Sequence, residues 1–161
     1  MASIFEQLNE MNDLELTGLA VNASITVPER LLNDMLSAEL RENKTITYCR
    51  ISIEPQNRVD VHLKTTFWPW PLTLKLKLFS SMDIKPSLTV RAFLENHVLL
   101  AKLGSLLKAL PSEVHLYQDQ VSVDIGALMK EPPPPKILAL LRAANVQTDI
   151  GQVILEVRME A

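Results

Sequence analysis

Every second residue is apolar through much of the middle of the chain, which is the spacing of a β-strand with one buried face. The clearest run is LTLKLKL at residues 72–78, and similar runs occupy Tyr48–Glu54, Arg58–Thr66 and Leu88–Leu94. The Pro-Gln-Asn sequence at residues 55–57 separates the run Tyr48–Glu54 from the run Arg58–Thr66 and is typical of a hairpin turn. The pattern therefore predicts an antiparallel meander with one apolar and one polar face.

Helical spacing follows the sequence Ile25-Thr-Val-Pro-Glu29, which we interpret as a capping box. In that motif Thr26 and Glu29 would each bond the backbone amide of the other. The apolar positions that follow lie on one stripe of a helix of about four turns, which Asn43 can close. They are Leu31, Leu32, Met35, Leu36 and Leu40.

A second amphipathic helix is predicted over Val98–Leu110, between the potential cap Asn96 and the helix-breaking Pro111. Its leucines would cover the apolar face of the sheet. The other expected elements are a helix at residues 3–12, strands at Glu15–Val21, Glu113–Leu116, Gln120–Asp124 and Gln152–Met159, and a helix over Ile137–Ala144.

These elements predict one α+β domain over residues 1–161, built as a curved antiparallel meander wrapped on a long amphipathic helix. Residues 1–13 would form an N-terminal helical extension. The EPPPPK sequence at residues 131–136 would be a stiff polyproline connector.

Composition narrows the class of partner. The net charge is −3, with 47% hydrophobic and only 5% aromatic residues, so the chain lacks the basic excess of a nucleic-acid-binding protein. An interior rich in leucine and poor in aromatics suits an aliphatic ligand cavity, but it equally suits an ordinary core. Composition leaves both alternatives open.

No motif for catalysis, a metal or a cofactor emerges. Ser105 and Lys108 have the S-x-x-K spacing of some acylating enzymes but lack the companion motifs. The three histidines are far apart, the single cysteine is Cys49, and four glycines provide no phosphate-binding loop. We therefore expect a protein that is not an enzyme and needs no cofactor.

The N-terminal sequence lacks the basic and long apolar regions of a signal peptide. No window has the roughly 18 consecutive apolar residues of a membrane span. The chain as written is expected to be cytoplasmic, or periplasmic if a leader has been removed.

Trp68 and Trp70, the two tryptophans of the chain, stand with Pro69 and Pro71 just before the strand at 72–78. Such a tip could cap the open end of the sheet, or it could form an interface with a partner or, weakly and peripherally, with a membrane.

The order of capped helix, four-stranded meander, apolar helix and strand–helix–strand tail resembles the tubular lipid-binding (TULIP) superfamily, in the small form of bacterial YceB-type lipoproteins. The sequences that carry the resemblance are the opening of the first helix at residues 25–29, the lysine-bearing strand Leu72–Phe79 and the ending at residues 144–157. The resemblance implies an apolar groove between helix and sheet for acyl or isoprenoid chains.

We therefore predict non-enzymatic binding of a lipid or another apolar molecule in this groove. The alternative is an interaction or structural module whose core is filled by its own leucines. The sequence leaves the oligomeric state open. The expected groove residues are Leu32, Met35, Leu36, Val61, Leu63, Leu74, Leu76, Leu99, Leu103 and Leu107, with Trp68 and Trp70 as the interface tip.

Overall fold

Two antiparallel sheets make up most of the fold. The structure is a computed structural model that describes residues 18, 20–96, 112–128 and 135–161. The strands of the described part are β1 (Ala20–Pro28), β2 (Ile46–Glu54), β3 (Arg58–Thr65), β4 (Leu72–Leu78), β5 (Thr89–Leu94), β6 (Val114–Tyr117), β7 (Gln120–Asp124), β8 (Leu141–Asp149) and β9 (Gln152–Glu160). The helices are α3 (Glu29–Glu39), which a 3-10 turn extends over Leu40–Glu42, α5 (Ile125–Leu128) and α6 (Pro135–Leu140).

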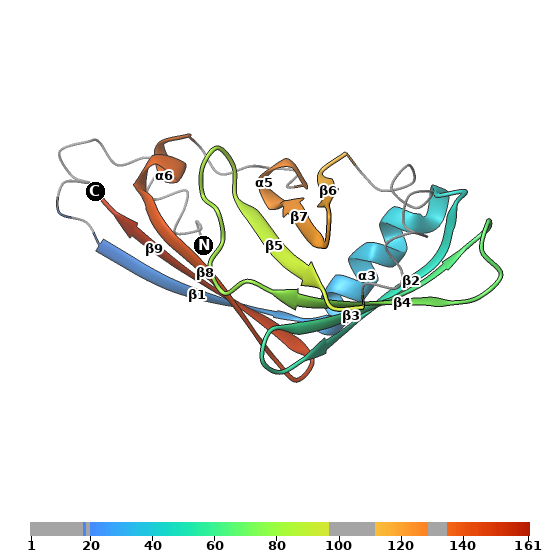
Figure 1. The fold of residues 1–161 in the computed structure, drawn as a ribbon. Coiled ribbons are helices and arrows are strands. Elements are labelled where there is room, and N and C mark those ends of the chain that lie inside the picture. The colour runs from blue at the N-terminus through green and yellow to red at the C-terminus, as the bar shows by residue number, and fades with distance from the viewer. Residues whose placement is uncertain (1–17, 19, 97–111, 129–134) are drawn as a thin grey trace.

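The larger sheet has the strand order β2-β3-β4-β5-β7-β6, and the smaller sheet has the order β1-β9-β8. Figure 1 shows the two sheets as one long curved surface, with α3, α5 and α6 on its upper side. An α+β fold with antiparallel sheets is thus confirmed, although the strands are divided between two sheets rather than arranged in one meander.

The predicted hairpin between β2 and β3 is present, and its turn explains the residues found there. Gln56 and Asn57 both have φ near +60°, a left-handed conformation that asparagine tolerates better than most residues. Cys49, Ile51 and Ile53 consequently face Leu63, Val61 and Val59 across the ladder.

The predicted capping box is wrong. Thr26 belongs to β1, where it lies opposite Ile154 of β9. Pro28, in extended conformation, precedes the first turn of α3, and no side chain bonds the helix start. Glu29 instead accepts a hydrogen bond from the amide of Ile53 at 2.8 Å. The β-branched residues of this segment therefore serve a strand ladder that local spacing could not reveal.

The predicted helix Ile137–Ala144 is wrong in its second half. The helix α6 ends at Leu140, and Leu141–Ala144 begin β8, which pairs with β9 as far as Asp149. The alanines at 143 and 144 favour a helix locally, but pairing with β9 along the whole strand overrides that preference. The segment resembling a helix exit is a hairpin, with Gly151 at φ +67° in its turn.

Several predictions lie outside the described residues. They include the helices at 3–12 and Val98–Leu110, with Leu99, Leu103 and Leu107, most of the strand Glu15–Val21, and the connector up to Pro134. The long helix on which the sheet was expected to wrap therefore stays a prediction.

Candidate functional site

The larger sheet has an unbroken aliphatic face. Alternation and strand register place the following side chains on it, and we refer to them as the apolar face: Cys49, Ile51, Ile53, Val59, Val61, Leu63, Leu72, Leu74, Leu76, Leu78, Val90, Ala92, Leu94, Val114, Leu116, Val121 and Val123. Four of the predicted groove residues, those on β3 and β4, belong to this face. It carries no charged side chain.

Burial of the apolar face is uneven. Leu63, Leu72 and Leu94 are buried and form a cluster with Ile46. Val61 and Leu74 pack against that cluster but remain only half-buried. Ile53, Val59 and Ala92 of the same face are also buried, so incomplete burial is confined to part of the face, including Val61, Leu74 and Leu76.

The helix α3 lies along the edge of the larger sheet. The Nδ2 of Asn33 donates to the carbonyl of Ile51 at 2.9 Å, and the Ile51 amide donates to Oδ1 of Asn33 at 2.7 Å. With the bond from Ile53 to Glu29, these contacts continue the ladder beyond edge strand β2. Sequence reasoning missed Asn33 and gave Glu29 a different role, although their i, i+4 spacing puts both residues on one face of the helix.

This position explains the modest burial of α3. None of its residues is buried. Leu32 and Leu36 are half-buried, whereas Met35 is 59% exposed. The helix therefore contributes less to the predicted groove than its apolar stripe suggested, because polar side chains hold it against the backbone of β2.

The smaller sheet continues the aliphatic surface. Ala144 and Val146 of β8 cluster with Met82, and Leu78 of β4 packs against the same cluster. Leu78 also stands on the apolar face of the larger sheet. The apolar sides of the two sheets therefore meet at β4 and β8.

Asn57 ties the sheets together at this junction. Its Oδ1 accepts from the amide of Thr148 at 2.9 Å, and its Nδ2 donates to the carbonyl of Val146 at 3.3 Å and to Oγ of Ser80 at 3.2 Å. The hydroxyl of Thr148 donates to the carbonyl of Glu54 at 2.6 Å. Hairpin β2–β3 is thereby fastened to β8, as the neighbouring hairpin ends in Figure 1 illustrate.

The tryptophan tip separates into two environments. Trp68 is half-buried and packs against the cluster at the end of the apolar face. Trp70 is 69% exposed, and Phe67 is 42% exposed. Nearby on the polar face, Nζ of Lys64 lies 5.7 Å from the ring centre of Tyr48.

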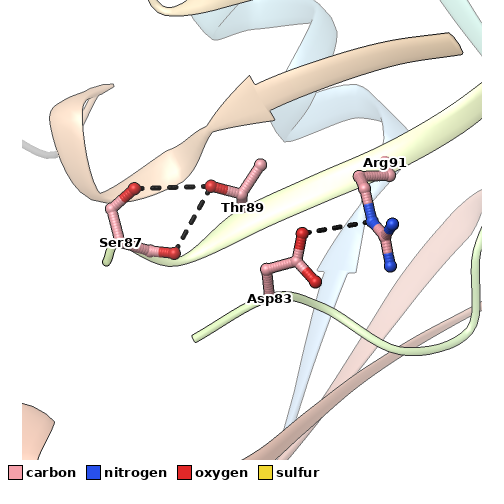
Figure 2. A network of polar contacts seen from close by, with 4 residues as sticks. All are labelled: Asp83, Ser87, Thr89 and Arg91. Carbon is pink, nitrogen blue, oxygen red and sulfur yellow. Dashed lines mark hydrogen bonds and ion pairs between the residues drawn. The ribbon is translucent and has the colours of Figure 1, made fainter. Parts of the chain in front are cut away.

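Polar clusters on the described residues have structural explanations. Asp124 accepts from the amide of Ala127 at 3.0 Å and from the hydroxyl of Ser87 at 2.8 Å, and these bonds hold the pKa of Asp124 below its ordinary value. They fix the start of α5. Figure 2 shows the adjoining network, in which Nε of Arg91 lies 3.1 Å from Asp83.

Among the described residues, His62 and Cys49 are of the kind that bind metals or act as nucleophiles. His62 bonds the hydroxyl of Thr73 at 3.0 Å, and no group of three potential metal ligands occurs within the described residues. Burial raises the pKa of the Cys49 thiol to about 11, so the thiol is neutral at pH 7. Ser105, Lys108 and His97 lie outside the described ranges.

Comparison of the chain with models of protein families, with curated proteins and with solved structures gave no match. Among the described helices, none is long and apolar enough to cross a membrane.

Proposed function

We propose that the protein binds the hydrocarbon chain of a lipid or isoprenoid along the apolar face. The observation that carries the proposal is the half-buried state of the uncharged centre of that face, around Val61, Leu74 and Leu76. Those side chains are aliphatic and come from neighbouring strands, so they present a broad surface rather than a single contact.

The energetics of such binding require no directional group. Burial of a methylene contributes roughly 0.8 kcal/mol, so about ten methylenes contribute roughly 8 kcal/mol. That value corresponds to a dissociation constant near 1 μM, before the cost of ordering the chain. Cys49, on the same face and with a neutral thiol, adds no charge that would oppose an acyl chain.

A protein-interaction role is the second candidate, and one observation favours it. Trp70 and Phe67 expose aromatic surface at one end of the sheet, and such residues are enriched at protein interfaces. In this alternative the apolar face is covered by the chain's own leucines, and the tip does the binding.

Native mass spectrometry of the freshly purified protein, followed by titration of the delipidated protein with fluorescent cis-parinaric acid, tests the first proposal. We expect a retained apolar molecule and saturable uptake of the probe. A protein that carries no such molecule and takes up no probe would overturn lipid binding.

A pair of variants on adjacent residues locates the probe. Leu74→Asn places an amide of similar size on the apolar face, whereas Lys75→Asn changes an exposed residue on the opposite face. We expect Leu74→Asn to weaken probe binding at least tenfold and Lys75→Asn to leave it unchanged. Equal effects of the two variants, with both proteins folded by circular dichroism, would place the probe elsewhere.

A further inference from the structure

Within the residues that the structure describes, nothing protects the outer edge of β1 in the way that the other sheet edges are protected. Side chains of α3 bond the edge of β2. The free side of β8 is joined by Ser80 and Met82, through hydrogen bonds with Val146 and Ala144. Edge strand β6 has only four residues, and short edge strands pair poorly.

By contrast, β1 is a nine-residue strand with the sequence AVNASITVP. It has no charged residue and no glycine, its one proline is its last residue, and its register with β9 runs without a bulge. Charges, bulges and internal prolines are the devices by which proteins block edge pairing. In the described part of the chain β1 pairs with β9 alone, and Ile25 is 45% exposed.

We propose that β1 pairs antiparallel with β1 of a second copy of this chain, which makes the smaller sheets continuous across a twofold axis. A homodimer with this symmetry uses one patch twice, so the patch must be self-complementary. The backbone hydrogen bonds between two edge strands supply much of the attraction in such pairings.

The sequence of β1 satisfies that requirement when the axis passes through Ser24, the middle of the strand. Asn22 then faces the second copy's Thr26 on the polar side. On the apolar side Ala23 faces the second copy's Ile25, so a small side chain meets a large one. Because an antiparallel pair keeps opposed residues on the same side, apolar meets apolar and polar meets polar throughout, and no like charges meet.

Ser24→Lys tests the pairing without harming the protomer. Within the protomer Ser24 is exposed and lies opposite Glu156 of β9, so a lysine there gains an opposite charge. In the dimer two lysines would face each other on the axis, and like charges directly opposed are destabilising. The matched control is Asn145→Lys, since Asn145 is exposed and faces Glu156 from the other side, on β8.

Sedimentation velocity over a range of concentrations should show a monomer–dimer equilibrium for the natural protein and for Asn145→Lys. Ser24→Lys should raise the dissociation constant at least tenfold, equivalent to about 1.4 kcal/mol. An equimolar mixture of Ser24→Lys and the natural protein should form mixed dimers, because only one lysine then lies on the axis. A natural protein that stays monomeric, or a dimer insensitive to Ser24→Lys, would overturn the proposal.

Hydrogen exchange supplies a second measurement that needs no variant. Amides of residues 21–27 that point away from β9 should become more protected as concentration rises. Protection that is already complete in dilute monomer would mean that another part of the same chain covers the edge, and it would refute pairing between copies.

Discussion

Asn57 offers the sharpest test of how the two sheets are joined, because two substitutions separate its backbone role from its side-chain role. Asn57→Gly removes the amide that bonds Thr148 and Val146 but accepts the positive φ of the turn. Asn57→Ala removes the same amide but keeps a β-carbon in the left-handed region, without the side chain that lets asparagine tolerate it.

The two substitutions should therefore differ by a predictable amount. The amide makes its hydrogen bonds with part-buried backbone groups of β8, and each such bond contributes about 1 kcal/mol. Asn57→Gly should thus lower the free energy of unfolding by about 2 kcal/mol. Asn57→Ala should cost about 1 kcal/mol more, because a β-carbon is disfavoured at φ +61°.

Urea unfolding followed by circular dichroism measures both values. Gln56→Gly is the matched control, since Gln56 has φ +62° in the same turn and bonds Lys77 through its backbone carbonyl rather than its side chain. It should change stability by less than about 0.5 kcal/mol, because the relief of strain offsets the entropy of glycine. If Asn57→Gly were as stable as the control, the amide would not hold the sheets together.

Three more predictions concern single residues. Asn33→Ala should lower the free energy of unfolding by about 1–2 kcal/mol in the same assay, because it frees both backbone groups of Ile51. The control Ser37→Ala, on the exposed side of α3, should leave it unchanged. If the two variants were equally stable, the Asn33 amide would not hold α3. Burial raises the pKa of the Cys49 thiol from 9.0 to about 11. At pH 8 the thiol should therefore react with iodoacetamide about 100-fold more slowly in the folded than in the unfolded protein. Equal rates would contradict its burial. Iodide should quench mainly the fluorescence of Trp70, which is 69% exposed. Trp70→Phe should therefore remove most of the quenchable emission, whereas Trp68→Phe should leave it. The opposite result would mean that Trp68, and not Trp70, is the exposed tryptophan.

Alternation alone predicted the strands of the larger sheet well. The runs around β2, β3 and β4 have apolar residues on one side and polar residues on the other, and each is joined to the next by six residues or fewer. Local spacing is sufficient there, because a hairpin brings together residues that are already close along the chain.

The smaller sheet could not be predicted in the same way. Its strand β1 pairs with β9, more than a hundred residues later in the chain, so nothing near Thr26 or Glu29 indicated a ladder. The expected cap and the expected helix over Leu141–Ala144 were both local interpretations of residues whose partners are distant. Asn57 was recognised as part of a turn, but its side-chain bond to Thr148 was not predicted, for the same reason.

The groove stays a prediction, and the structure shows only which side of the sheet four of its residues occupy. Val61, Leu63, Leu74 and Leu76 share the apolar face because strand periodicity fixes their side. Met35 is mainly exposed, because a helical stripe shows which residues are apolar but not what the helix lies against. Asn33 and Glu29 bond the backbone of β2, and these bonds place α3 along the edge of the larger sheet.

That role of α3 bears on the choice between a ligand groove and a filled core. A helix held at the edge of β2 by Asn33 and Glu29 leaves the centre of the apolar face to another occupant. The leucines of Val98–Leu110 are one candidate, and a hydrocarbon chain is the other. Both are aliphatic and would compete for the same surface, so binding of a lipid should weaken any contact that those leucines make there. If the predicted helix Val98–Leu110 covers this face, Leu103→Ala should lower the free energy of unfolding less when cis-parinaric acid is bound than when it is absent. Urea unfolding with and without the probe measures that difference.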